Sequence, residues 1–226
     1  MENKTTIGEY QISTLVTGGW KENCYLIKHL PGGELALIDP GDDAERIVKI
    51  ILDAGAKLKH IFLTHAHHDH IGAAAAVSRK FNLPCILHEN DKRLLRHSPM
   101  YALRFEGRQI KAPTFLSTFG GEPTFDFGNQ QIQTFYTPGH TNGSVCYAFD
   151  GFIFTGDTLL NHELGRTDLP GSDAHQIKKS AKRLINSVSD DAIIFPGHGD
   201  LWTMEEAKIW WSTVDRVAAE YECKIC

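Results

Sequence analysis

The sequence predicts an α/β protein, a four-layer αββα sandwich in which two mixed β-sheets stack face to face and helices cover both outer faces. Two observations lead to this prediction. Segments rich in β-forming residues alternate with segments of helical periodicity, and this order occurs twice along the 226 residues. Four expected strands also lead into loops that contain a His or Asp, and loops at strand ends are where α/β proteins place their ligands.

The first half of the chain is expected to form one sheet with its covering helices. A turn at Pro31-Gly32-Gly33 separates two strands, and Asp42 or Asp43 is expected to cap the first helix. The expected strands are Tyr10–Thr17, 23–28, Glu34–Ile38, 59–63 and Cys85–His88, and the second expected helix is 71–81.

The second half repeats this organisation, and we expect one domain over residues 1–226. The expected strands are 131–136, Val145–Phe149, 152–154 and 193–195, and the expected helices are 174–188 and a final one that begins after Thr203. Thr203 and Glu206 have the spacing of a capping box. The final helix carries an apolar stripe typical of core packing, made of Ala207, Trp210, Trp211, Val214, Ala218 and Tyr221.

The composition is that of a soluble globular protein, with 42% apolar residues, 23% charged residues and a net charge of −5. Acidic and basic residues are interspersed, so we expect no nucleic-acid partner. Residues 1–8 are polar and lack the apolar stretch of a signal peptide, and no apolar run reaches the roughly 18 residues of a membrane span. We therefore expect a cytoplasmic protein with no membrane partner.

None of the five cysteines is expected to be catalytic. Cys24, Cys85 and Cys146 lie in apolar strand-like segments, where a buried, reduced thiol is the expected state. Cys223 and Cys226 form a C-x-x-C motif at the end of a helical segment, whereas a redox pair normally opens a helix after a strand.

The string THAHHDH at residues 64–70 carries most of the chemical information in the chain. It begins where an apolar strand ends, and side chains alternate in extended backbone, so His65, His67 and Asp69 are expected on one side. His70 can turn towards a second point as the helix begins, whereas His68 alternates away and is left out of the site. Asp69 could alternatively cap the helix. Imidazole and carboxylate ligands favour zinc, iron or manganese, and this spacing suits two ions better than one.

Three further strand ends add one candidate ligand each. PGHT at residues 138–141 contains His140, TGD at 155–157 contains Asp157, and PGHG at 196–199 contains His198. A glycine beside each of these residues allows a tight turn. Each string is weak alone, but together with residues 64–70 they predict one metal centre.

With these strings, the chain resembles the metallo-β-lactamase fold superfamily in its glyoxalase II-like (hydroxyacylglutathione hydrolase-like) branch. The matching strings follow the family's order over nearly the whole chain: NCYL at 23–26, IDPG at 38–41, THAHHDH, PGHT, TGD, GRTD at 165–168 and PGHG. Glyoxalase II proper adds a C-terminal helical domain that contributes to glutathione binding, whereas about one helix follows His198 here. The chain is therefore more similar to the short, single-domain members.

The resemblance implies the ligand set and its ions. Two groups would share one bridging residue: His65, His67 and His140 for one ion, Asp69, His70 and His198 for the other, and Asp157 for both. Asp39, in the IDPG turn, would orient the ligands. The implied cofactors are two divalent ions, zinc first, with iron or manganese as alternatives, or else a single iron.

The implied reaction is hydrolysis of a thioester similar to S-lactoylglutathione. Two metal ions can share a hydroxide that attacks a carbonyl carbon, with Asp69 and Asp157 as the catalytic carboxylates. No dedicated general acid accompanies the ligands, and a thiol with a pKa near 8.5 leaves without one. The Lys- and Arg-rich segment 92–111 is either a lid over an anionic thioester or a solvated loop, and Arg166 and Asp168 either contact substrate or pin their own loop.

Two other functions remain open at this point. Persulfide dioxygenases share the fold but use one iron held by two His and one Asp, which would be His65, His140 and Asp157 here. The GRTD string is similar to one in that group, whereas PGHG is more similar to the short hydrolases. A metal-binding protein without turnover is the third candidate. A β-lactamase is less expected, because a ligand set with Asp69 resembles that of the thioesterases.

Overall fold

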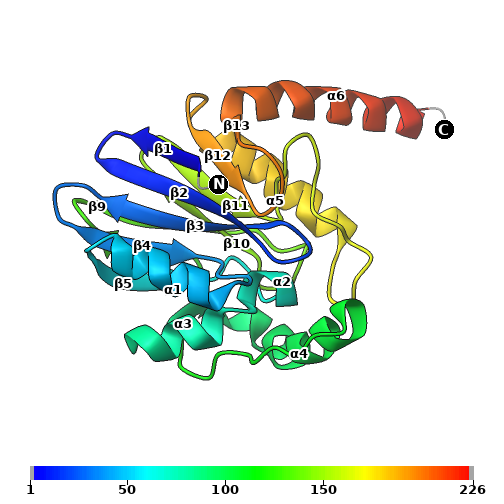
Figure 1. Cartoon of the computed structure of the whole chain (residues 1–226). Helices are drawn as coiled ribbons and strands as arrows, with labels where there is room; N and C mark the ends of the chain where they lie inside the picture. The colour runs from blue at the N-terminus through cyan, green and yellow to red at the C-terminus, as the bar shows by residue number, and fades with distance from the viewer. Residues whose placement is uncertain (1–2, 224–226) are drawn as a thin grey trace.

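The computed structural model describes residues 3–223 and the side chains as far as residue 214. Two β-sheets pack face to face with helices on both outer faces, which confirms the predicted four-layer sandwich (Figure 1). The seven-stranded sheet has the order β1-β2-β3-β4-β5-β6-β7, and the six-stranded sheet has the order β13-β12-β11-β10-β9-β8. Each half of the chain therefore builds one sheet, as the repeated order of the sequence indicates.

The elements have the following bounds. The first sheet contains β1 (Asn3–Ile7), β2 (Tyr10–Thr17), β3 (Glu22–His29), β4 (Glu34–Ile38), β5 (Lys57–Phe62), β6 (Cys85–His88) and β7 (Leu116–Phe119). The second contains β8 (Thr124–Phe127), β9 (Gln130–Tyr136), β10 (Val145–Phe149), β11 (Phe152–Gly156), β12 (Ile193–Pro196) and β13 (Trp202–Thr203). The helices are α1 (Ala44–Asp53), α2 (His68–Ile71), α3 (Ala74–Phe81), a 3₁₀ turn η1 (Glu89–Asp91), α4 (Lys92–Glu106), α5 (Ala174–Ser187) and α6 (Met204–Cys223).

Three apolar clusters hold the layers together. Aromatic side chains fill the space between the sheets, among them Tyr25, Phe62 and Phe154, and all three are buried. Ile47 of α1 and Val77 of α3 belong to a second cluster on the outer face of the first sheet, and the apolar faces of α5 and α6 cover the second sheet. Burial of these side chains stabilises each layer against its neighbour.

The strand directions bring the expected ligand loops to one end of the sandwich. β4, β5 and β6 run parallel in the first sheet. In the second sheet β9 and β11 both run antiparallel to β10, and β12 runs parallel to β11. Backbone hydrogen bonds join the sheets at this end, from Asn23 N to Gly197 O (2.8 Å) and from Val145 N to Thr64 O (2.9 Å). The carboxyl ends of β5, β9, β11 and β12 therefore meet.

The predicted helix over 71–81 is wrong in its boundaries. The chain instead forms the short helix α2, a break at Gly72 and Ala73, and then α3. Ala73 N donates a hydrogen bond to Pro40 O (3.0 Å), and a Cβ on Gly72 would lie 2.3 Å from Gly41 O. The break therefore docks this segment on the turn after β4.

The segment 92–111 is not a solvated loop, since it contains the 15-residue helix α4, while a lid over an anionic thioester stays a prediction. The sequence analysis further missed β1, β7, β8 and β13, which are short or lie at sheet edges. α1 begins at Ala44 after Asp43, but the Asp43 side chain forms no capping hydrogen bond. The capping box of α6 is confirmed, because Glu206 N donates to Thr203 Oγ1 and Thr203 N donates to Glu206 Oε2.

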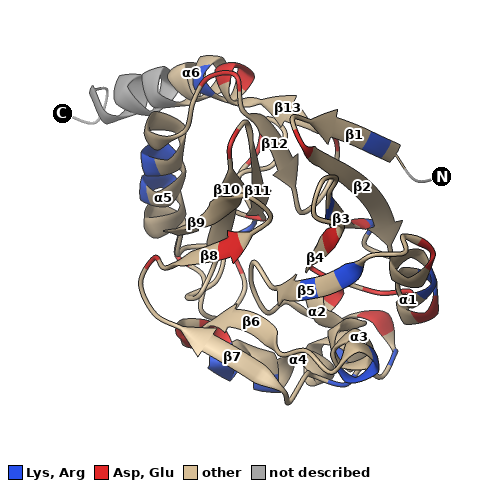
Figure 2. Ribbon diagram, turned by 90° about the vertical axis from the view of Figure 1, so that its left-hand side faces the viewer, with Lys and Arg blue, Asp and Glu red and all other residues tan. Residues whose placement is uncertain are grey.

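The three cysteines whose side chains are described fit the expectation. Cys24, Cys85 and Cys146 are buried free thiols, and burial raises the pKa of Cys85 and of Cys146 to about 12. Cys226 and the side chains of Cys223, Ala218 and Tyr221 lie outside the described residues. Within residues 3–223, no helix is long and apolar enough to cross a membrane. Lys and Arg are scattered over several outer helices in Figure 2.

Candidate metal centre

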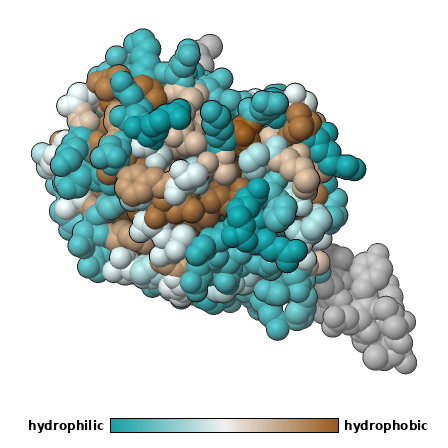
Figure 3. Space-filling view, turned by 90° about the horizontal axis from the view of Figure 1, so that it is seen from below, coloured by the Kyte–Doolittle hydropathy of each residue, from teal (hydrophilic) through white to brown (hydrophobic). Residues whose placement is uncertain are grey.

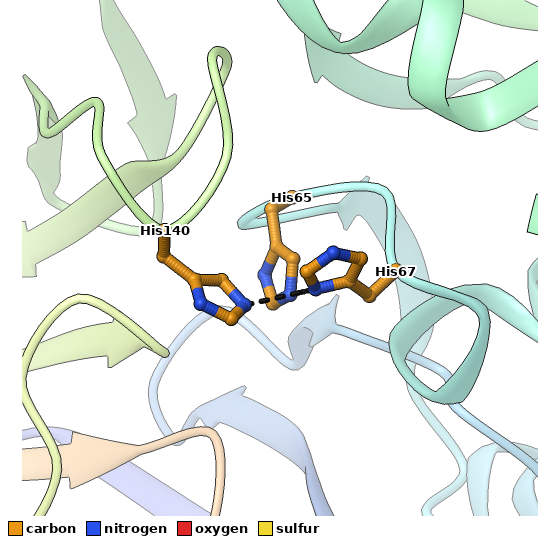
Figure 4. A group of neighbouring side chains, drawn as sticks. All are labelled: His65, His67 and His140. Atoms are coloured by element: carbon orange, nitrogen blue, oxygen red, sulfur yellow. Dashed lines mark hydrogen bonds between the residues drawn. The ribbon is translucent and has the colours of Figure 1, made fainter. Parts of the chain in front are cut away.

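Three histidines converge on one point at the carboxyl ends of β5 and β9. His65 Nε2 lies 3.1 Å from His67 Nδ1, and His67 Nδ1 lies 2.8 Å from His140 Nε2. Figure 4 shows the three rings, carried by loops from different sheets, with one nitrogen of each directed towards the others. All three side chains are buried, and their nitrogens are close enough together to hold a metal ion.

A second group lies beside the first and combines α2 with the loop after β12. His70 Nε2 and His198 Nε2 are 3.3 Å apart, and Asp69 Oδ2 lies 3.3 Å from His198 Nε2. These three residues form another set that could hold a metal ion. Asp69 therefore does not share a side with His65 and His67, because the helix begins at His68 and turns Asp69 towards His198. Asp69 is not the helix cap either, since His67 occupies that position.

Asp157 lies between the two groups. Its Oδ2 is 3.4 Å from His140 Nε2, and its Oδ1 is 3.4 Å from His70 Nε2. Asp157 follows β11 directly, in the middle of the second sheet, and is mostly buried. Oδ2 also lies 3.7 Å from His198 Nε2, so the carboxylate contacts both groups, as a shared ligand requires.

The hydrogen bonds of the outer ring nitrogens support a fit to metal ions. His140 Nδ1 contacts Arg166 O (2.9 Å), and His198 Nδ1 contacts Trp20 O (3.1 Å). A carbonyl oxygen only accepts hydrogen bonds, so each Nδ1 carries the proton and each Nε2 presents a lone pair to the centre. Several such lone pairs and two carboxylates within a few ångströms of one another repel unless a cation lies between them.

Charge is distributed unevenly between the two groups. Burial lowers the pKa of His65 and His140 and brings that of His67 to about 3, so these rings are neutral and ready to bind a metal. Burial also opposes the charge on His70, but Asp157 and Asp69 outweigh it and raise the pKa of this ring well above its usual value. The carboxylates around His70 thus favour positive charge at this group, as binding of a divalent cation requires.

Asp39 fixes the His70 ring. Its Oδ2 lies 3.0 Å from His70 Nδ1, and its two oxygens accept hydrogen bonds from Thr64 N (2.7 Å) and Thr64 Oγ1 (2.5 Å). Asp39 is buried and has a φ of 47°, a left-handed conformation that this turn after β4 imposes. The carboxylate thus connects the ligand loop to the neighbouring strand, in agreement with the orienting role implied by the resemblance.

Two glycines allow the loops to approach this closely. A Cβ on Gly197 would lie 2.2 Å from Asp157 Oδ1, and a Cβ on Gly41 would lie 1.9 Å from Asp69 O. Neither distance is compatible with a side chain, so the glycines of PGHG and IDPG are required by packing around the centre.

Asp91 is a buried carboxylate that the sequence analysis missed. Its Oδ2 accepts hydrogen bonds from Ala66 N (2.8 Å) and Thr141 Oγ1 (3.0 Å), and its Oδ1 accepts one from Gly143 N (2.7 Å). Ala66 separates His65 from His67, so Asp91 connects both loops of the three-histidine group. Burial raises the pKa of Asp91 to about 6, and the hydrogen bonds oppose this shift.

We expect Asp91→Asn to weaken zinc binding by roughly 10–100-fold, the usual cost of losing a group that orients ligands. The amide nitrogen would replace one oxygen acceptor and leave either Gly143 N or Ala66 N facing another donor. Competition with a chelator measures the affinity. Glu89→Gln, an exposed neighbour in η1, is the control. Equal zinc affinity in the Asp91 variant would show that the loops keep their positions without this carboxylate.

A cavity of about 240 Å³ opens over the two groups. His68, which the sequence analysis left out, lines it, with Nε2 2.7 Å from Glu106 Oε1. Arg166 also lines the cavity, but Asp168 holds its guanidinium by two contacts of 2.7 Å. The ion pair lowers the pKa of Asp168 to about 2. The loop-pinning alternative for this pair therefore matches the geometry, while contact with substrate remains a prediction for Arg166.

Two stacked sheets with His/Asp clusters at one end define a metallohydrolase type of site. The family model "Metallo-beta-lactamase superfamily" matches residues 17–198, and the chain therefore belongs to that superfamily. It is 33% identical over 208 residues to "Hydroxyacylglutathione hydrolase GloC" of Haemophilus influenzae, an alignment that covers 87% of this chain and 94% of the relative.

Two solved structures are also similar. "BLEG-1 B3 metallo-beta-lactamase" is 32% identical with a TM-score of 0.77, over 86% of this chain and 95% of that one. "TTHA1623 in a di-iron-bound form" is 33% identical with a TM-score of 0.76, over 85% of this chain and 95% of that one. The superfamily is thus established, and members with differently named activities are about equally similar to this chain.

Proposed function

We propose that this protein is a two-metal hydrolase of thioesters, similar to the short glyoxalase II-like enzymes. The observation that carries the proposal is the pair of ligand groups with Asp157 between them. His65, His67 and His140 would hold one ion, and Asp69, His70 and His198 the other. The similarity to a hydroxyacylglutathione hydrolase and to a di-iron protein supports the same assignment.

When bound, two divalent ions would supply hydroxide at neutral pH and polarise a carbonyl group. The residues of this chain would provide the rest. Asp39, Arg166 O and Trp20 O hold the rings of His70, His140 and His198 in place. Asp69 and Asp157 would balance the charge of the ions, and the cavity walls would exclude bulk water from the reacting carbonyl.

The nature of the leaving group favours a thioester over an amide. A thiolate leaves without being protonated, whereas an amine requires a proton donor. Arg166, the only Lys or Arg among the described residues that line the cavity, keeps its proton and is bound by Asp168, so it supplies no proton to a leaving group. Leaving-group chemistry therefore favours thioesters, whereas the similarity to a B3 β-lactamase does not distinguish the two substrates.

The first experiment is metal content per chain in protein purified without added metal or chelator. We expect about two ions per chain and hydrolysis of S-lactoylglutathione that is lost with a chelator and restored by zinc, manganese or iron. Nitrocefin, a chromogenic β-lactam, and oxygen uptake with glutathione persulfide are measured on the same sample. About one iron with rapid oxygen uptake would replace the proposal with a persulfide dioxygenase. Full metal content without turnover of any substrate would favour a binding role.

A further inference from the structure

One side of the cavity over the metal centre is built from apolar side chains. α4 contributes Leu94, Tyr101 and Phe105, and the loop after β11 contributes Leu160, Leu164 and Leu169. Trp20 completes the wall from the turn between β2 and β3, and it is 46% exposed. Phe105 is 49% exposed, so both aromatic rings present apolar surface to solvent at the cavity.

Apart from the candidate ligands and His68, the cavity offers few groups that could recognise a polar acyl chain, namely the Tyr101 hydroxyl, Glu163 and Arg166. The Lys and Arg side chains of the segment 92–111 do not line this cavity, because α4 turns Leu94, Tyr101 and Phe105 towards it instead. His68 is held at Glu106, and its ring stacks on Phe105 at a centroid distance of 6.1 Å. Figure 3 shows the side of the molecule covered by α3 and α4, where hydrophobic surface is gathered between hydrophilic residues.

We infer that the cavity binds an apolar acyl group, and that the preferred substrates are thioesters of medium-chain or aromatic acids rather than of lactate. This inference rests on the proposed thioester hydrolysis. A carbonyl carbon placed beside Asp157 and His140 would direct its acyl chain along Leu94, Phe105 and Leu164. Exposed apolar residues of this kind lower the stability of the unliganded surface but strengthen binding of an apolar ligand.

The size of the expected preference for a longer acyl chain follows from the apolar surface that the chain buries. Each methylene group moved from water into an apolar wall improves binding roughly fourfold. Hexanoyl exceeds acetyl by four methylenes, so partial burial of the chain already gives at least about a tenfold preference. The lactoyl group carries a hydroxyl, and removing it from water against Leu94, Phe105 and Leu164 costs affinity.

The test compares N-acetylcysteamine thioesters of acetate, lactate and hexanoate with the zinc-loaded protein. We expect kcat/KM for the hexanoyl ester to exceed the other two by about tenfold or more. A lactoyl ester that is hydrolysed as well as or better than the hexanoyl ester would overturn the inference while leaving thioester hydrolysis in place.

Substitutions in the apolar wall test whether this wall causes the preference for the hexanoyl ester. Phe105→Ala should reduce the ratio of hexanoyl to acetyl kcat/KM several-fold, and Phe105→Leu, which keeps an apolar side chain, should restore most of it. Leu103→Ala is the matched control, because Leu103 is also exposed on α4 but does not line the cavity. Equal ratios in the wild-type protein and Phe105→Ala would overturn the assignment of this wall to the acyl group.

A binding measurement keeps the inference separate from the reaction. Calorimetry on chelator-treated protein should show hexanamide binding at least about tenfold more tightly than acetamide, with the difference reduced in Phe105→Ala. If no thioester is hydrolysed but this difference is present, the proposed function fails and the apolar site stands. If the two amides bind equally, the inference fails whatever the enzyme hydrolyses.

Discussion

Asp157→Ala is expected to remove both metal ions and to lower thioester hydrolysis by more than about 100-fold. Loss of a residue that merely orients a ligand already costs about 10–100-fold in metal affinity. The Asp157 carboxylate contacts both ligand groups, at 3.4 Å from His70 Nε2 and from His140 Nε2. Its removal also deprives His70 of the charge that contributes most to its raised pKa. Metal content by mass spectrometry and kcat/KM measure the two effects.

Asp150→Ala is the control for this variant, because Asp150 is an exposed aspartate at the other end of β11. Circular dichroism establishes that both variants fold, so that metal loss can be attributed to the site. Retention of two ions per chain by Asp157→Ala would contradict the shared-ligand assignment, whatever happens to the activity.

The sequence was sufficient to predict the sandwich because both halves carry the same signal. Apolar β-rich runs and amphipathic helices alternate twice, and the three clusters of buried side chains follow that order. The strands that were missed are those with weak patterns. β7 and β8 each have four residues, most of them exposed or half-buried, so hydrogen bonding to a neighbouring strand decides their structure rather than their own sequence.

The candidate ligand residues could be selected from the sequence because glycine, His and Asp recur at strand ends, and the fold brings those ends together. The alternation of side chains in a strand could not predict that Asp69 lies with His70 and His198, because this position depends on a helix that begins at His68. Asp91 could not be predicted as part of the site for a different reason. It lies in an ordinary acidic turn, and its importance comes from three donors that belong to distant loops. Similarly, only the orientation of α4 shows that a Lys- and Arg-rich segment presents apolar side chains to the cavity.

His198→Ala separates the two chemistries that share this fold. We expect it to lose one of two ions and to lower thioester hydrolysis by more than about 100-fold, because His198 belongs to the His/Asp group and not to the three-histidine group. His65, His140 and Asp157, the set that a single iron would use, stay in place, so a one-iron oxygenase would keep much of its oxygen uptake. Metal stoichiometry, thioester hydrolysis and oxygen uptake with glutathione persulfide are measured on the same preparation.

His175→Ala, an exposed histidine at the start of α5, is the matched control. The His198 side chain is 23% exposed, so the variant should fold. Because His198 Nδ1 contacts Trp20 O, the apolar cavity wall should shift only locally, at Trp20. Unchanged thioester hydrolysis with one ion per chain would exclude the two-metal mechanism. The second ion matters to the reaction only if its loss affects the rate, because a ligand group that is complete in geometry can still be dispensable for chemistry.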